Sequence, residues 1–351
     1  MKPIIKYPRQ EYLARFSGET IDIGEVINSK IPVKASIQVD TLTHHTLVVG
    51  STGSGKTHTV SIIVNELVRK TSKYKVLIID WHGEYMKLIN RAEYLEPRRM
   101  PLNIIEHNNI YEFIELLQDS LGLTPPQVYI LEKIFENKKY MINNIYDLRN
   151  VLENIEDQGS WFRESRLSLL RKISPLTRDG LREVFDAYKD KIIDYINICE
   201  NPIIIDASRI QDPYIRRIYV SILLKKIFKE AVKRKVWSRN KLLVVLEEAH
   251  NVLGRNNYIG IVARMLSEIR KFGVGLVIVS QSPSQLVDEA MLNTNTKIIH
   301  SIKSLNDLEV ISKSLYLPLN IEKIIPYLDV GEAVLYTRGL KKPVIIKVKE
   351  I

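Results

Sequence analysis

The chain is poor in cysteine and lacks long apolar runs. Its only cysteine, Cys199, excludes an internal disulfide and a cysteine-rich zinc site, and such sparse use suits a reducing compartment. No uninterrupted apolar stretch approaches the roughly 20 residues that a membrane-spanning helix needs. The first residues, MKPIIKYPRQEY, also lack the apolar centre of a secretion signal. We therefore expect a soluble, cytoplasmic protein.

Acidic residues are fewer than basic ones. The 351 residues include 51 Lys and Arg against 41 Asp and Glu, which gives a formal net charge of +10. This balance favours a polyanionic partner, either nucleic acid or an acidic membrane surface. An enzyme that is basic for other reasons is an equal alternative. The length is sufficient for one large α/β domain, or for a core with a sizeable insertion.

Short runs of Val, Ile and Leu recur between segments of helical periodicity. Because these runs do not alternate with polar residues, each predicts a strand that is buried on both faces, and the alternation with helices predicts a mainly parallel sheet. The runs lie at residues 47–50, 76–80, 203–207, 242–248, 275–281 and 297–302. The sequence therefore predicts an α/β fold with helices on both faces of the sheet.

The strand signal is interrupted once. Residues 86–200 show helical patterns, and we interpret them as an all-helical insertion into a core made of residues 43–85 and 201–351. Residues 1–42 predict a short N-terminal β segment that caps or edges the core. The end of the chain predicts a hairpin.

One segment matches the pattern G-x-x-x-x-G-K-[ST] of a phosphate-binding loop. Small residues allow backbone N–H groups to point at phosphate oxygens, and the following helix adds its positive end. The lysine is expected to reach the β- and γ-phosphates, and the last hydroxyl to hold Mg²⁺. A glycine-rich turn without a ligand is the alternative, which the preceding apolar strand disfavours. The residues are Gly50, Ser51, Thr52, Gly53, Ser54, Gly55, Lys56 and Thr57.

Two glutamates follow the apolar run LLVVL. Carboxylates at the end of a parallel strand face the ligand crevice, and neighbouring strand residues point in opposite directions. We therefore assign Glu247 to the Mg²⁺ shell and Glu248 to the polarisation of the attacking water. The alternative is a solvated, acidic start of a helix. Since no guanine-reading N-K-x-D string is present, we favour ATP over GTP.

Four strings together resemble one family. After GSTGSGKT come IIDWHGEY (78–85), LEEAHNVL (246–253) and IRKFGVGLVIVSQSP (269–283), in the order found in HerA-like ATPases of the HerA/FtsK superfamily. The similarity runs from about residue 21 to the C-terminus. It implies a RecA/ASCE-type P-loop core with ATP and Mg²⁺ as cofactors. It also implies a homo-hexameric ring that moves on double-stranded DNA in DNA processing or repair.

The resemblance assigns further roles. Asp80 and Glu84 would lie beside the nucleotide, Gln281 would sense the γ-phosphate, and Arg270 would reach a neighbouring subunit's ATP, with Arg264 as a second candidate. From the residues alone, Asp80 is either catalytic or a cap of the strand end, and Arg270 could be a cation at a helix end. A NurA-like nuclease partner is also implied, although only about 40 residues precede the loop, where full-length members carry a further domain.

Several segments could contact DNA phosphates. A helix with Lys225, Lys226, Lys229 and Lys233 is one candidate, with a solvated outer face as the favoured alternative. The others are the loop at 254–260 and the segment at 161–166. A DNA pump for transfer between cells or virus packaging, and an ATP-switched clamp or scaffold, are the rival functions. His82 and His250 fit ordinary polar histidines better than metal ligands.

Overall fold

The computed structural model describes residues 18–27, 29, 32–105, 110–137, 142–178, 181–185, 191–234, 237, 240–255, 266–315 and 317–351. These residues are organised around one sheet with the strand order β2-β1-β11-β10-β9-β3-β8-β7-β4-β6-β5. The strands are β1 Thr20–Val26, β2 Lys34–Gln38, β3 Thr46–Val49, β4 Tyr74–Asp80, β5 Glu93–Leu95, β6 Ile203–Asp206, β7 Lys241–Leu246, β8 Val274–Ser280, β9 Thr296–Ile299, β10 Glu332–Tyr336 and β11 Val344–Val348.

The sheet has a parallel part and an antiparallel part. From β9 through β3, β8, β7, β4 and β6 to β5, neighbouring strands run parallel. Strands β10, β11, β1 and β2 continue the sheet with antiparallel pairs. The predicted parallel α/β core and the terminal hairpin are therefore confirmed, and the N-terminal β segment pairs with that hairpin. All carboxyl ends of the parallel strands lie at one edge, where ligands bind in such sheets.

Both faces of the central strands are buried, as the unbroken apolar runs predict. Along β7, Leu242, Val244 and Leu246 pack into one apolar core, and Leu243 and Val245 pack into the other. Helix α1 Lys56–Lys70 covers the second face, and α8 Pro213–Arg234 belongs to the first. Further core helices among the described residues are α9 His250–Leu253, α11 Asp288–Leu292, α12 Leu305–Leu315 and α13 Leu319–Glu322.

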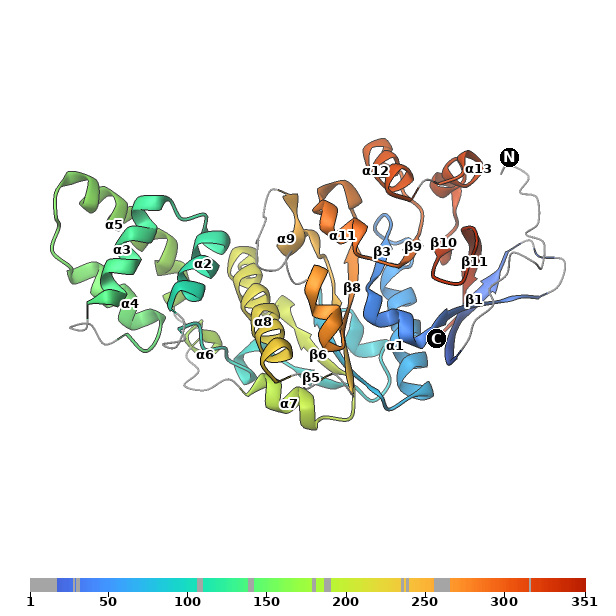
Figure 1. Cartoon of the computed structure of the whole chain (residues 1–351), viewed down its shortest axis with the longest axis horizontal. Helices are drawn as coiled ribbons and strands as arrows, with labels where there is room; N and C mark the ends of the chain where they lie inside the picture. Colours follow the sequence, from blue (N-terminus) through green and yellow to red (C-terminus); the bar gives the residue numbers. More distant parts are fainter. Residues whose placement is uncertain are drawn as a thin grey trace.

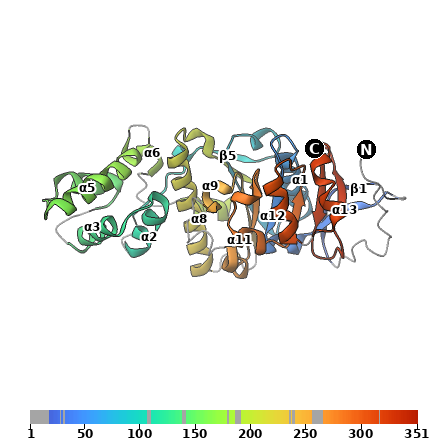
Figure 2. The ribbon, with the colours of Figure 1, turned by 90° about the horizontal axis from the view of Figure 1, so that it is seen from above.

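The segment between β4 and β6 is mostly helical, but one expectation for it is wrong. Its helices are α2 Ile110–Leu121, α3 Pro125–Glu136, α4 Ile145–Asn154, α5 Ser160–Ile173, α6 Arg182–Phe185 and α7 Ile192–Ile198. It also contains β5, which pairs with β6 at the edge of the sheet and is too short to leave a pattern in the sequence. Helices α2 to α5 lie at one end of the elongated molecule, and the N-terminal strands lie at the other (Figures 1 and 2).

The lysines of α8 do not all lie on one exposed face, and of those considered above Lys233 is exposed. Lys225 and Lys226 are buried. The Nζ of Lys225 donates to the carbonyl oxygen of Glu112 on α2 at 2.5 Å, and the Nζ of Lys229 lies 3.8 Å from the Glu112 carboxylate. These cations therefore dock the helical segment onto the core. None of the described helices is both long enough and apolar enough to cross a membrane.

Candidate nucleotide-binding site

The glycine-rich loop joins the carboxyl end of β3 to the first turn of α1. Gly50, Gly53 and Gly55 have φ angles of 155°, 75° and 105°, which side chains rarely allow. The loop is also closely packed from behind. A Cβ on Gly50 would lie 2.6 Å from Cβ of His300, and one on Gly55 would lie 3.2 Å from the amide nitrogen of Gly331. Glycine at positions 50 and 55 therefore allows the loop to pack directly against His300 and Gly331.

His300, which the sequence analysis did not select, supports this loop. It follows β9 and is fully buried. One ring nitrogen lies 2.9 Å from Oγ1 of Thr59 on α1, and the other lies 2.9 Å from the carbonyl oxygen of Glu332 on β10. Burial lowers the pKa of His300 to about 4, so the ring is neutral at pH 7. The run KIIHSI gave a signal, since it places a histidine directly after a buried strand.

Lys56 lies where the pattern predicts, at the first position of α1. The residue is buried, and its Nζ donates to the carbonyl oxygen of Ser51 at 3.1 Å. Burial lowers the pKa of Lys56, against the opposing effect of the nearby carboxylates of Glu248, Glu247 and Glu84. A phosphate would restore a counter-charge to this ammonium, as the expected role requires.

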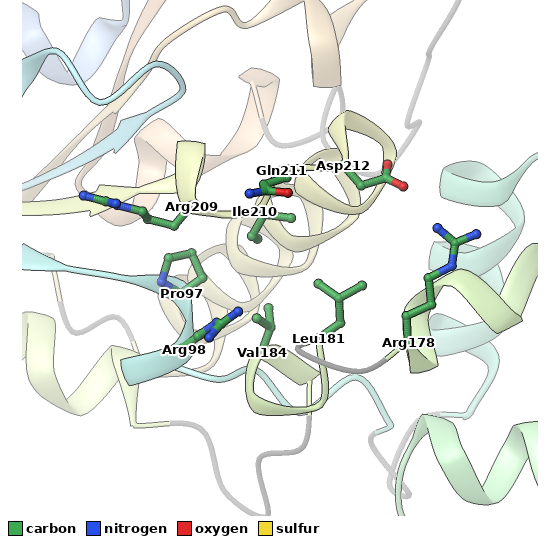
Figure 3. A pocket seen from close by; sticks show the side chains of 9 residues that line it. All are labelled: Pro97, Arg98, Arg178, Leu181, Val184, Arg209, Ile210, Gln211 and Asp212. Atoms are coloured by element: carbon green, nitrogen blue, oxygen red, sulfur yellow. The ribbon is translucent and has the colours of Figure 1, made fainter.

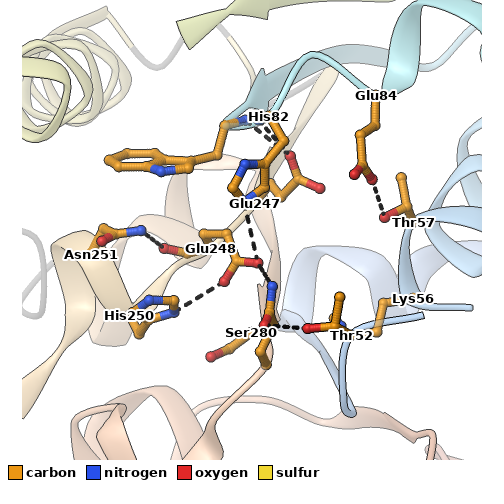
Figure 4. A network of polar contacts seen from close by, with 12 residues as sticks. Thr52, Lys56, Thr57, His82, Glu84, Glu247, Glu248, His250, Asn251 and Ser280 are labelled. Carbon is orange, nitrogen blue, oxygen red and sulfur yellow. Dashed lines mark hydrogen bonds and ion pairs between the residues drawn. The ribbon is translucent and has the colours of Figure 1, made fainter. Parts of the chain in front are cut away.

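Thr57 points toward an acid from the turn that follows β4. Its Oγ1 donates to Oε2 of Glu84 at 3.1 Å, and Figure 4 shows the two side chains facing each other. Hydroxyl and carboxylate oxygens are hard ligands of the kind that Mg²⁺ takes, usually together with substrate phosphates and water. Among the described residues, no three His, Cys, Asp or Glu side chains form a metal-binding group. The donors thus fit a Mg²⁺ ion that the nucleotide helps to hold.

Glu248 lies at the centre of the polar network in Figure 4. Its φ angle of 46° is unusual for a residue with a side chain. The carboxylate accepts a hydrogen bond from Nε2 of Gln281, and it lies 3.2 Å from Nδ1 of His250 and 3.6 Å from Nε2 of His82. Burial by itself would raise the pKa of Glu248, but the contacts with His250 and Gln281 hold it below its usual value. The carboxylate is therefore ionised at neutral pH.

Gln281 connects this glutamate to the phosphate loop. Its Oε1 accepts a hydrogen bond from Oγ1 of Thr52 at 2.7 Å while its amide donates to Glu248. The side chain comes from the carboxyl end of β8, two strands away from β4. Hence the tertiary structure brings the predicted sensor, the predicted base and the loop into direct contact.

Glu247 and Asp80 turn away from this network into a buried turn. The carboxylate of Asp80 accepts hydrogen bonds from the amides of Gly83 at 2.8 Å and Tyr85 at 2.9 Å, and that of Glu247 accepts one from Trp81 at 2.9 Å. Burial and the neighbouring carboxylate of Asp80 raise the pKa of Glu247 to about 9. The geometry favours the capping role of Asp80. The metal role of Glu247 stays a prediction, and Glu84 is the acid next to Thr57.

The same turn is held from α8. The guanidinium of Arg216 donates to the carbonyl oxygens of Trp81 and Ile210, each at 3.0 Å, and it lies 5.2 Å from the centre of the Trp81 ring. This position places His82, the next residue, against Glu248. Arg216 has no distinguishing signal in the sequence, because the sequence of α8 contains several other cations.

Arg270 lies outside this constellation. It belongs to the short helix Ile269–Phe272 that precedes β8, and it is exposed. Since β8 runs parallel to β3, Arg270 lies at the opposite edge of the sheet from the glycine-rich loop. It therefore does not contact the site of its own chain, and a role in a neighbour's site stays a prediction. Arg264 and residues 256–260 fall outside the described residues.

Comparisons with known proteins place this site in a family. The family model described as the central domain of helicase HerA matches residues 21–227. The DNA double-strand break repair helicase HerA of Sulfurisphaera tokodaii is 32% identical over 374 residues, which span 99% of this chain and 72% of the relative. The chain belongs to the HerA family.

Solved structures share the fold of this HerA-family chain at low sequence identity. VirB4 of Thermoanaerobacter pseudethanolicus aligns with a TM-score of 0.72 and 14% identity, over 96% of this chain and 98% of that one. The plasmid coupling protein TrwB in complex with ADP and Mg²⁺ aligns with a TM-score of 0.64 and 15% identity, over 97% of both chains. At these identities the likeness concerns the α/β fold, which confirms the predicted fold class.

Proposed function

We propose that this HerA-family chain is an ATP-driven motor that moves along double-stranded DNA. The observation that carries the proposal is the direct contact of Gln281 with both Glu248 and Thr52 of the glycine-rich loop. This contact links a base to the place where a terminal phosphate would lie. Membership of a family whose named relatives include DNA break repair helicases supports DNA as the track.

Each side chain of the site would have a separate role in ATP hydrolysis. Lys56 would neutralise the β- and γ-phosphates, and the oxygens of Thr57 and Glu84 would hold a Mg²⁺ ion, which supplies further positive charge at the phosphates when bound. The ionised Glu248 would accept a proton from the attacking water. Gln281 would change partners when a γ-phosphate is present, which would signal the nucleotide state to Glu248 and Thr52.

The assembly is proposed from the family resemblance and from the position of Arg270. An arginine at the edge opposite the loop is unable to serve its own site, but it could reach a neighbour's ATP in a homo-hexameric ring. A guanidinium placed in this way stabilises charge that develops during phosphoryl transfer. A NurA-like nuclease partner is a further proposal that rests on the resemblance alone.

The test is DNA-stimulated ATP hydrolysis. Glu248→Gln removes the proton acceptor and keeps the shape, so we expect hydrolysis to fall by about 10²–10⁴-fold while ATP still binds. Lys56→Ala should abolish hydrolysis together with tight nucleotide binding. The matched control is Glu309→Gln, since Glu309 is an exposed carboxylate on α12 that pairs only with Lys313 in the described structure; it should match the parent.

The outcomes separate the proposed motor from its rivals. A Glu248→Gln variant that turns over at the parent rate would exclude Glu248 as the base. Stimulation of hydrolysis by blunt duplex together with displacement of a third strand supports translocation. Stimulation without displacement would favour an ATP-switched clamp, and hydrolysis that ignores DNA would remove DNA as the track.

A further inference from the structure

A separate pocket lies between the core and the helical segment. It has a volume of about 280 Å³. Its walls come from the short helix Pro97–Arg99, from the chain around α6, and from the link between β6 and α8. The floor is apolar, because Ile210 and Val184 are buried there, and Leu181 faces them in Figure 3. The nucleotide-binding residues described above do not line this pocket.

Two arginines stand on opposite sides of this apolar floor. Figure 3 shows Arg98 beside Val184, and Arg178 beyond Leu181 on the other side. Both side chains are exposed. A third arginine, Arg209, also lines the pocket, but its guanidinium points away from the centre and lies 2.9 Å from the carboxylate of Asp206. Arg98 and Arg178 are therefore the cations that could receive a ligand.

Neither of these two cations is held by a strong ion pair. The Nη1 of Arg98 lies 3.6 Å from the carboxylate of Glu183, and both side chains are more than half exposed. An exposed pair of this kind is weak because water screens it, so an anion of higher charge could replace it. Within the described residues, the guanidinium of Arg178 makes no hydrogen bond or ion pair.

The acid in the wall of the pocket, Asp212, already accepts hydrogen bonds from backbone amides. Oδ1 of Asp212 accepts hydrogen bonds from the amides of Tyr214 at 2.9 Å and Ile215 at 3.3 Å, which caps the first turn of α8. Its charge is therefore partly compensated by the positive end of a 22-residue helix. The amide side chain of Gln211 is exposed and lies over the pocket, where it could donate to an oxygen ligand.

We propose that this pocket binds phosphate groups through Arg98 and Arg178. Planar guanidinium groups match the oxygens of a phosphate and bind them in a bidentate manner. The apolar floor would receive the part of the ligand that carries the phosphate. The ligand could be a phosphodiester of a nucleic acid strand or a small phosphorylated molecule. The binding proposal does not depend on ATP hydrolysis by the chain.

The experiment measures binding of two probes, pyrophosphate and a fluorescent DNA duplex, in a Lys56→Ala background that weakens phosphate binding at the glycine-rich loop. The double substitution Arg98→Ala and Arg178→Ala removes two charge-assisted contacts. We expect it to reduce affinity for at least one probe by on the order of tenfold or more. Glu183→Gln releases Arg98 and should tighten the same probe severalfold. Arg338→Ala, an exposed arginine after β10, is the matched control.

Each outcome has a meaning. Loss of pyrophosphate binding alone assigns the pocket to a small phosphorylated ligand, loss of duplex binding alone assigns it to nucleic acid, and loss of both shows that it accepts either. Leu181→Trp, which fills the pocket and keeps both charges, should reproduce the loss, and it replaces the double variant if that variant melts at a lower temperature than the parent. Unchanged affinity for both probes in both variants would overturn the proposal.

Discussion

Acidification should destabilise the fold through His300, the buried histidine behind the glycine-rich loop. Its ring contacts Thr59 and the carbonyl oxygen of Glu332, which joins α1 to β10 directly beneath Gly50. Burial, assisted by the positive charge of Lys56, lowers the pKa of His300 to about 4. The folded chain therefore keeps this ring neutral at pH values where an unfolded chain protonates it.

The sign and size follow from the two pKa values. Between an unfolded pKa of 6.5 and a folded pKa of about 4, the unfolded state binds more protons, so the free energy of unfolding falls as the pH falls. A difference of about 2.5 pKa units corresponds to about 3 kcal/mol at 1.36 kcal/mol per unit. This loss of stability is absent above pH 6.5 and complete near pH 4.

Urea denaturation at a series of pH values from 8 to 4 tests this prediction, with the parent chain compared to His300→Gln. The variant lacks the titrating group, so on acidification the parent should lose about 3 kcal/mol of stability relative to the variant, and the two stability curves should meet or cross. At pH 8 the variant should be less stable by about 1–3 kcal/mol, because a buried hydrogen-bond partner is lost. Burial also lowers the pKa of His45 to about 4. His45 is present in both chains, so its contribution to the difference between their stabilities cancels. Parallel curves would refute the assignment.

Three further predictions concern the loop, the turn and the assembly. Gly55→Ala should weaken nucleotide binding more than Gly53→Ala, because both positions have positive φ but only the Cβ at 55 would press on Gly331; titration with a fluorescent ATP analogue measures both. Asp80→Asn should lower the free energy of unfolding by about 1–3 kcal/mol, measured by urea denaturation at pH 7, because an amide NH₂ would face the N–H groups of the turn. Mixing Arg270→Ala chains with parent chains should reduce ATP hydrolysis more than in proportion to their share.

Each of these predictions can fail in a distinct way. Equal effects of alanine at the two glycines would show that backbone strain alone matters. An Asp80→Asn variant with parent stability but no hydrolysis would restore the catalytic role that the sequence left open. Activity that falls in simple proportion to the Arg270→Ala chains would exclude a role across a subunit boundary.

Much of the fold was predictable because its signals are local. The unbroken apolar runs around Leu47 and Leu243 predicted strands buried on both faces, and the two apolar cores confirm this. Strand β5 gave no such signal, since three residues at a sheet edge with partly exposed side chains need no pattern. The sequence likewise gave no indication that lysines of α8 contact Glu112, because these contacts depend on how a distant helix packs.

The candidate site shows the same contrast between local signals and contacts that depend on packing. By itself, the sequence determined the glycine-rich loop, Lys56 and the acids after the strands, since each depends on a few consecutive residues. The contact of Gln281 with Glu248 and Thr52, the support of the loop by His300 and the capping of a turn by Asp80 depend on the folded arrangement of distant segments. The physical reason is that strand order is set by packing across the whole sheet, so residues more than 200 positions apart along the chain, such as Thr52 and Gln281, meet at an edge that no local pattern describes.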